Sequence, residues 1–253
     1  MKLSVQLYSL RDAGDLDTQL AMARAAGFKW VESVASHGLP PEEFADKVAA
    51  HGLRVSSMHV SMAMAEHDLQ GVIDTCHATD CRLAIVPWLP MGERPSTAIG
   101  WQAIGARLAT IGNQLNNEGL RLAYHNHDFE FHLYSGRTAL DWIFSTARPQ
   151  QLGWEADLGW VARAGLDPMA TIAGHEGRLV SVHVKDVAPP GTAIEEDGWC
   201  ALGQGIVPWE ALLAQLPAHV SLFVLEHDRP VDHATMLKTS YDFLYQQLII
   251  NGH

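Results

Sequence analysis

Four apolar segments in the second half of the chain each run directly into carboxylate or imidazole side chains. The charged and imidazole residues at these ends are His125, His127, Asp128 and Glu130; Glu155 and Asp157; His183, Lys185 and Asp186; Glu226, His227 and Asp228. Burying such groups without partners is costly, so four consecutive cases favour a functional site over isolated ion pairs. Nitrogen and oxygen donors suit one divalent ion such as Mn²⁺, Co²⁺, Mg²⁺ or Zn²⁺. No cysteine stands at these ends.

The first half of the chain offers polar and aromatic side chains at similar positions. We expect Gln6, Tyr8 and His59 to hydrogen-bond a substrate, and Trp88 to stack on it. Trp160 is a further stacking candidate, although core packing is the favoured role for it. Glu155 shares a strand face with Asp157, because alternate residues of a strand point the same way, and it is a candidate substrate contact or a partner for Lys185.

Short apolar segments alternate with helix-length segments along the whole chain. The expected strands are Leu3–Tyr8, Trp30–Val34, Leu53–Val60, Leu83–Trp88, Leu120–Asn126, Leu152–Asp157, Leu179–Val184 and Val220–Glu226. The expected helices are Leu16–Ala26, Pro41–His51, Glu66–Thr79, Ala98–Asn117, Thr138–Ala147, Pro168–Ala173, Trp209–Gln215 and His233–Ile249. Eight such pairs in 253 residues predict a single (β/α)8 TIM-barrel domain over residues 1–253.

The barrel reading explains why the polar residues cluster at strand ends. In a TIM barrel the chemistry sits at the C-terminal ends of the strands, so these side chains should meet at one mouth. A doubly wound sheet would need a glycine-rich turn after its first strand, and Ser9–Gly14 is not one. The longest connection, residues 186–208, is typical of a functional lid.

Composition excludes several classes of protein. With 17 Lys and Arg against 29 Asp and Glu, the formal charge is −12, which repels nucleic-acid backbones. Arg11 and Asp12 come too early for a signal-peptide core, and no apolar run is long enough for a membrane span. The three cysteines lack C-x-x-C spacing. We therefore expect a cytoplasmic enzyme that binds neither nucleic acid nor membrane.

Three motifs resemble the xylose isomerase-like TIM-barrel superfamily, which includes the AP endonuclease family 2: Glu155-x-Asp157-x-x-Trp160, His183-x-Lys185-Asp186 and Glu226-x-Asp228. The segments Gln6–Arg11, Tyr124–Phe131 and Gly203–Gly205 are similar to its sugar phosphate isomerase/epimerase branch. The resemblance covers nearly the whole chain. Members include ketose epimerases, sugar isomerases, inosose dehydratases and endonuclease IV-type repair enzymes.

The resemblance implies a metal site with Glu, Asp, His and Glu ligands from strands five to eight. Asp157, His183 and Glu226 match the last three positions. His125 replaces the first glutamate, which departs from an epimerase arrangement with two opposed glutamates. We expect Glu130 to fold back as the fourth ligand, with His125 and His127 facing the substrate; the reverse assignment stays open.

A divalent ion that chelates a carbonyl and its neighbouring hydroxyl acidifies the hydrogen between them and stabilises an enediolate. The resemblance implies Glu226 as ligand and base, while His125 and His127 are candidate bases of near-neutral pKa. Lys185 could polarise the carbonyl, or pair with Asp186 or Glu155. We expect a metal-dependent isomerase or epimerase of a non-phosphorylated sugar or keto-sugar, in a homodimer or homotetramer. The alternatives are a dehydratase or lyase of a keto-inositol or keto-sugar, a metal-dependent phosphodiesterase or endonuclease, and a non-catalytic sugar-binding barrel.

Overall fold

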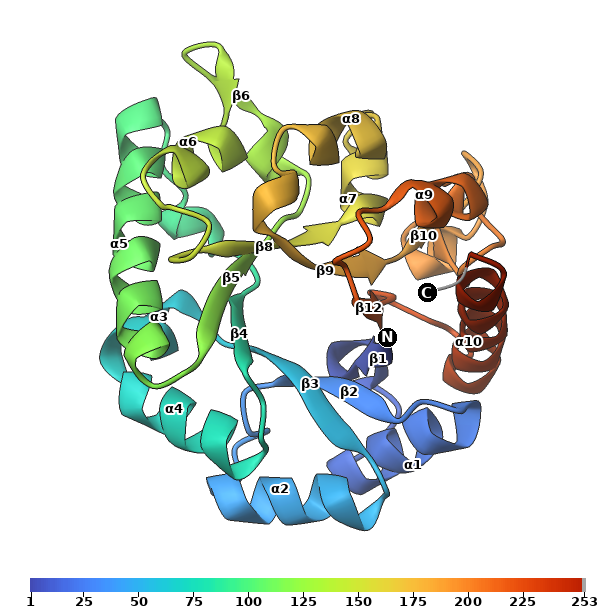
Figure 1. Cartoon of the computed structure of the whole chain (residues 1–253). Coiled ribbons are helices and arrows are strands. Elements are labelled where there is room, and N and C mark those ends of the chain that lie inside the picture. The colour runs from blue at the N-terminus through green and yellow to red at the C-terminus, as the bar shows by residue number, and fades with distance from the viewer. Residues whose placement is uncertain (252–253) are drawn as a thin grey trace.

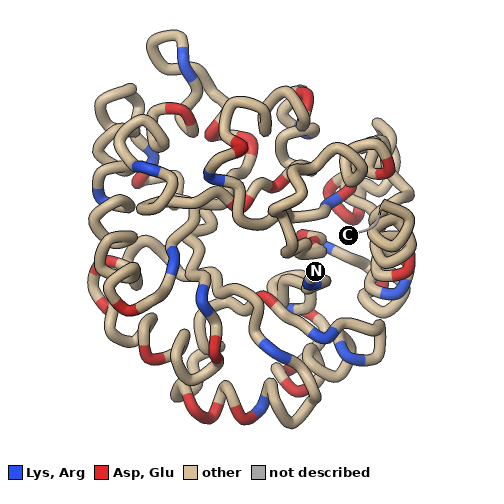
Figure 2. The backbone as a smooth tube through the Cα atoms, viewed as in Figure 1, with Lys and Arg blue, Asp and Glu red and all other residues tan. Residues whose placement is uncertain are grey.

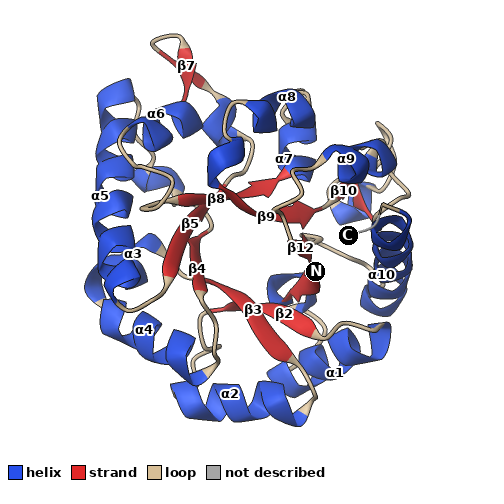
Figure 3. Cartoon of the chain, in the orientation of Figure 1, coloured by secondary structure: helices blue, strands red, loops and turns tan. Residues whose placement is uncertain are grey.

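The expected strands form a closed parallel barrel in the computed structural model, which describes residues 1–251 (Figures 1 and 3). The barrel strands are β1 (Lys2–Gln6), β2 (Trp30–Val34), β3 (Arg54–His59), β4 (Leu83–Val86), β5 (Arg121–His125), β8 (Gly153–Asp157), β9 (Leu179–Val184) and β12 (Leu222–Leu225). Each pairs in parallel with its sequence neighbour, and β12 closes on β1, with Val5 opposite Leu225. The predicted (β/α)8 TIM barrel is confirmed.

Helices surround the barrel (Figure 3). They are α1 (Leu16–Ala26), α2 (Pro41–Ala50), α3 (Met62–His67), α4 (Leu69–Ala78), α5 (Ala98–Asn117), α6 (Ala139–Ser145), α7 (Leu158–Arg163), α8 (Pro168–Ala173), α9 (Trp209–Gln215) and α10 (His233–Ile250). Side-chain caps fix several starts: Asp15 accepts a hydrogen bond from Thr18 N, Thr97 from Gly100 N and Asp232 from Thr235 N.

Two helical features differ from the prediction. The expected helix Glu66–Thr79 is two helices, because Asp68 leaves the helical region (φ −139°) and its side chain caps the start of α4. Helix α7 was not predicted. It begins directly after β8 without a turn, and the Asp157 side chain caps it by accepting from Trp160 N at 2.8 Å. Asp157 therefore ends a strand and starts a helix.

The barrel interior has an apolar lower part and a polar upper part. Leu83, Ile85, Ala123, Leu222 and Val224 form a small buried cluster apart from the main core between strands and helices. Side chains two residues further along a strand face the same way, so the interior continues upward into His125 and Glu226. This alternation positions the polar strand ends over a rigid apolar base.

The long connection after β9 is an anchored hairpin. It contains β10 (Asp186–Val187) paired antiparallel with β11 (Trp199–Cys200). The Asp186 carboxylate accepts hydrogen bonds from the backbone N–H groups of Val187, Gly203, Gly205 and Val207 at 2.9–3.2 Å. No residue of 187–208 lines the central cavity in the described part of the chain, so the expected lid over the site is not present in this conformation.

Charged residues are distributed over the outer surface. Figure 2 shows Lys and Arg positions scattered among acidic ones on the surrounding helices, with no broad basic face in this view. Among residues 1–251, no helix is both long and apolar enough to cross a membrane.

Candidate active site

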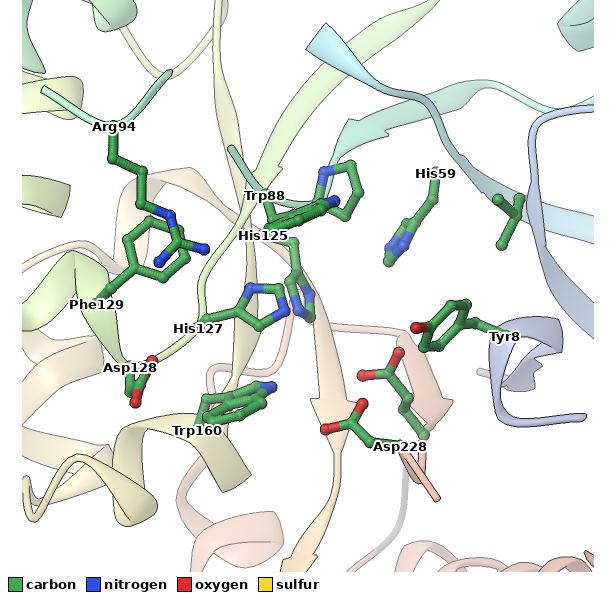
Figure 4. Close-up of a pocket in the computed structure, with 13 residues that line it drawn as sticks. Tyr8, His59, Trp88, Arg94, His125, His127, Asp128, Phe129, Trp160 and Asp228 are labelled. Atoms are coloured by element: carbon green, nitrogen blue, oxygen red, sulfur yellow. The ribbon is translucent and has the colours of Figure 1, made fainter. Parts of the chain in front are cut away.

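A cavity of about 520 Å³ opens at the C-terminal ends of the strands (Figure 4). Its walls come from strand ends and from the loops that follow them. The lining residues are Tyr8, Val34, His59, Pro87, Trp88, Arg94, His125, His127, Asp128, Phe129, Trp160, Glu226 and Asp228. Imidazole, carboxylate and aromatic side chains thus face one space, as predicted from the strand ends.

Four residues form a group that could hold a metal ion, and two of them, His125 and Glu226, line this cavity. His125, Asp157, His183 and Glu226 each offer one ligand atom, and these atoms lie within 4.8 Å of one another. Nδ1 of His183 is 3.2 Å from Glu226 Oε2 and 4.0 Å from Asp157 Oδ2, and His125 Nε2 is 3.9 Å from the same Asp157 oxygen. All four side chains are buried. We call them the outer group.

An unpaired carboxylate oxygen tests whether the outer group fits a cation. Oδ1 of Asp157 caps α7 by accepting a hydrogen bond, whereas its buried Oδ2 has no hydrogen-bond partner among the described residues. Burial raises the pKa of Asp157 to about 7, although the charges of Lys185 and His183 act in the opposite direction. A divalent cation would satisfy this oxygen, and two carboxylates with two imidazoles are a donor set that such ions accept. The residues present fit the implied metal.

A second layer of polar side chains lies directly beneath the outer group. Nε2 of His183 is 2.7 Å from Glu32 Oε1 and 3.0 Å from Glu155 Oε2, and Nε2 of His59 is 2.9 Å from each of the same two oxygens. Ser181 donates to Glu155 at 2.7 Å. Because this layer holds Nε2 of His183, Nδ1 is left to face the outer group.

The buried histidines of the site differ in protonation state, because the pKa values of His125 and His127 are lowered whereas those of His59 and His183 are raised. Burial lowers the pKa of His125 to about 4, and lowers that of His127 well below its usual range, so both are neutral at pH 7. Burial acts the same way on His59, but the carboxylates of Glu32 and Glu155 outweigh it and raise its pKa to about 9. The rings that face the cavity from β5 are therefore available as proton acceptors or ligands.

Lys185 is buried behind the cavity wall and does not line the cavity. Its Nζ is 2.7 Å from Asp228 Oδ2 and 3.3 Å from Glu226 Oε2, and lies over the rings of Trp160 and Trp199 at 4.9 and 4.3 Å from their centroids. It thus pairs with neither of the expected partners, Asp186 and Glu155. Its placement makes it a fixed countercharge for two carboxylates rather than a group that touches a carbonyl.

Glu130 lies outside the outer group. Its Oε1 accepts from the Tyr124 hydroxyl at 2.7 Å and its Oε2 from the backbone N–H of His127 at 2.8 Å. These bonds hold the turn after β5, Phe129–Phe131, and burial raises the pKa of Glu130 to about 8. The structure brings His125, not Glu130, to Asp157, His183 and Glu226, because His125 is still on the strand whereas Glu130 has turned away in the loop.

The remaining predicted residues divide between the cavity and the layer beneath it. Tyr8, His59, Trp88, His127 and Trp160 line the cavity, and Tyr8 and Trp88 are 43% and 45% exposed. Gln6 and Glu155 do not line it. Gln6 is buried and donates to Glu32 at 2.9 Å. Gln6 and Glu155 therefore belong to the layer beneath the outer group.

Three further residues of this region were absent from the predicted site. Asp228 follows the end of β12, which was a signal for it, whereas Glu32 lies in the middle of β2 and nothing in the sequence indicated that it would reach the β9 histidine. Arg94 lies in the loop after β4, far from any strand end, and carried no signal.

Comparison with known proteins identifies the class to which this fold and site belong. The family model described as "Xylose isomerase-like TIM barrel" matches residues 20–247. The chain therefore belongs to the xylose isomerase-like TIM-barrel family, as the motifs suggested.

Individual relatives are more distant. The inosose dehydratase of Salmonella typhimurium is 26% identical over 144 residues, which cover 54% of this chain and 42% of that protein, less than half of its length. A sugar phosphate isomerase/epimerase from Parabacteroides distasonis superposes with a TM-score of 0.79 at 16% identity, covering 96% and 93% of the two chains. An IolI protein with a bound zinc atom superposes with a TM-score of 0.74 at 14% identity over 99% of both chains. These structures share the fold of this chain.

Proposed function

We propose that this protein is a divalent-metal-dependent isomerase or epimerase that removes a proton next to the carbonyl of a sugar or keto-sugar. The observation that carries the proposal is the convergence of His125, Asp157, His183 and Glu226 at an open cavity. The zinc in the IolI structure supports a metal in a barrel of this fold. We assign these four residues as ligands, with His125 in place of Glu130.

A bound divalent ion would supply Lewis acidity, drawing electron density from a substrate carbonyl and its neighbouring hydroxyl. The chain supplies the proton transfers. Glu226 lines the cavity and is the candidate base, because it is ionised. Burial opposes the charged form of Glu226, but the positive charges of Lys185 and His183 outweigh burial and lower its pKa well below the usual range.

His127, in the loop after β5, is the candidate for returning the proton. It lines the cavity, and its ring packs against His125 at 5.1 Å and Trp160 at 5.2 Å between centroids. Its imidazole is neutral at pH 7, so it could accept a proton and pass it on, whereas His125 is assigned to the metal. Return to the same carbon on its other face is epimerisation, whereas return to the adjacent carbon is isomerisation. Trp88 and Trp160 would stack against the ring of the substrate.

Dehydration of a keto-inositol or keto-sugar is the second candidate. Two observations favour it: the curated relative is an inosose dehydratase, and His125 stands where an epimerase would have a second glutamate. The first step is the same removal of a proton beside a carbonyl. The elimination then expels a β-hydroxyl, which takes up one proton and leaves as water.

The test measures metal content and the fate of one hydrogen. Metal analysis should give one divalent ion per chain for the wild type and for Glu130→Gln, and none for Asp157→Ala or His183→Ala; His125→Ala should bind more weakly. With zinc or magnesium in heavy water, NMR of a panel of ketoses and inososes should show one C–H signal replaced by deuterium. A carbonyl moved to the adjacent carbon identifies an isomerase, inversion at the exchanged carbon identifies an epimerase, and a product lighter by one water identifies the dehydratase.

Two results would contradict the proposal. If Asp157→Ala and His183→Ala, still folded by circular dichroism, kept their full metal content, the outer group would not be the site. If metal were lost from Glu130→Gln and retained in His125→Ala, the fourth ligand would be Glu130.

A further inference from the structure

One arginine lines the cavity. Among the lining residues Arg94 is the sole Lys or Arg, in a chain whose formal net charge is −12. It follows the short turn Met91–Glu93 in the loop after β4. Nothing in the proton transfers described above uses it.

Arg94 is held in place without its terminal nitrogens. Its Nε donates to the carbonyl of Leu89 at 2.8 Å, and its guanidinium lies 3.5 Å from the ring centroid of Phe129 and 5.6 Å from that of Trp88. Within residues 1–251 no hydrogen bond or ion pair engages Nη1 or Nη2. The aromatic faces therefore orient the guanidinium and leave its N–H edge free.

The acidic groups around Arg94 do not neutralise it. Glu130 lies on the protein side, where both its oxygens are bound by Tyr124 and by the His127 backbone. Asp128 lines the cavity but forms no ion pair with Arg94 in the described structure. Figure 4 places Arg94 and Asp228 on opposite sides of the cavity, with His125 and His127 between them. A ligand held at the outer group can thus extend toward Arg94.

We propose that Arg94 binds a carboxylate of the substrate, so that the enzyme acts on a keto-sugar or keto-cyclitol acid rather than a neutral sugar. This rests on the proposed function, because the carbonyl end of the same molecule occupies the outer group. A guanidinium edge matches a carboxylate through two parallel N–H···O bonds. Phosphate fits less well, because a dianion at this place would meet one cation and the neighbouring Asp128, with no lysine on the cavity wall.

The test compares two ligands that differ only in the charged group. 5-Keto-D-gluconate and L-sorbose share their carbon chain and stereocentres, and the first carries a carboxylate where the second carries a hydroxymethyl group. Calorimetry on the zinc-loaded wild type should show the acid binding roughly 10- to 100-fold tighter, as expected for a charge-assisted pair. Arg94→Met should remove this preference while changing the Kd of L-sorbose by less than about threefold, and Arg94→Lys should keep part of it.

Arg137→Met is the matched control. Arg137 also stacks on an aromatic ring, at 4.7 Å from Trp142, but lies outside the cavity, so this variant should behave as the wild type. A preference that survives Arg94→Met, or a wild type that binds the acid no tighter than the neutral sugar, overturns the inference. Tighter binding of D-fructose 6-phosphate than of the acid would overturn the choice of carboxylate. If the protein binds its full content of zinc, any of these results refutes only the role of Arg94 and not the proposed function. If the protein binds no zinc, the proposed function itself is refuted.

Discussion

Replacing Glu32 by Gln should weaken metal binding although Glu32 is not a proposed ligand. Glu32 is fully buried in the layer beneath the outer group, and its Oε1 is 2.7 Å from Nε2 of His183. A carboxylate on the far nitrogen of a metal-binding imidazole fixes the ring and raises its basicity. Glu32→Gln keeps the size of the side chain and removes the charge, so it tests the electrostatic part of this support.

The expected loss is 10- to 100-fold in metal affinity, or about 1.4–2.8 kcal/mol. The pH dependence sharpens the prediction. Burial opposes the charged form of His183, but Glu155, Glu32 and Glu226 outweigh it and raise its pKa well above the usual value. The proton on Nδ1 must leave before a metal binds, so the affinity of the wild type should rise with pH. In Glu32→Gln, His183 holds its proton less tightly than in the wild type. The loss of metal affinity relative to the wild type should therefore be largest at alkaline pH and smaller at acid pH.

Competition with a chelator, or the visible spectrum of bound cobalt, measures the affinity at several pH values. Glu66→Gln is the control, because Glu66 is a carboxylate paired with Arg107 on the outer surface, 2.6 Å from its Nε. Circular dichroism establishes that Glu32→Gln is folded. Equal affinities for wild type and Glu32→Gln across the pH range would refute the coupling through His183. A deficit of the same size at every pH would mean that Glu32 shapes the site but does not set the proton affinity of the histidine.

Three further outcomes are expected. Zinc at 100 times its Kd should raise the thermal unfolding midpoint by about 5–10 °C. Binding to the folded state at this concentration adds about 2.7 kcal/mol to the free energy of unfolding of a chain of this size. The midpoint of a variant that lacks the Asp157 carboxylate should not change. Gly205→Ala should lower the free energy of unfolding in urea by about 2 kcal/mol, because the new methyl group meets the Asp186 carboxylate. Gly177→Ala has open space around the added methyl group and should cost little. Equal losses of stability in the two variants would contradict this prediction. Asp141→Asn should lose about 1–2 kcal/mol of unfolding free energy near pH 7, because the hydrogen bond from His175 lowers the pKa of Asp141 from 3.8 to about 2. This stabilisation is present above pH 4 and disappears as the pH falls toward 2. A difference in stability between variant and wild type that persists in acid would refute the prediction.

The sequence predicted the barrel because strand and helix periodicity is strong in this chain. Every expected strand is present, with ends displaced by at most two residues. The strand ends also predicted which side chains meet, because the C-terminal ends of parallel strands share one edge. Backbone geometry predicted that the strand ends meet, and the family resemblance implied the set Asp157, His183 and Glu226, whose ligand atoms are neighbours in the structure.

Loop residues could not be placed in this way. Glu130 lies five residues beyond His125, and whether it folds back depends on the Tyr124 hydroxyl and the His127 N–H, which have no sequence signature. Arg94 is similar, because an aromatic ring from another loop decides its orientation. Helix α7 was missed because its N-cap is the last residue of a strand, so no turn residues announce it.

The charge balance of the outer group points to the kind of ion that it accepts. Asp157, Glu226 and Asp228 surround a single lysine, Lys185, whose Nζ lies within 3.9 Å of an oxygen of each. With all three carboxylates ionised and His183 deprotonated, as metal binding requires, two negative charges among these groups remain uncompensated, and without a cation the pKa of Asp157 is about 7. A divalent ion matches this deficit and would hold Asp157 ionised. A neutral methionine in place of Lys185 would leave a third negative charge, so the lysine sets the charge of the site for a divalent ion.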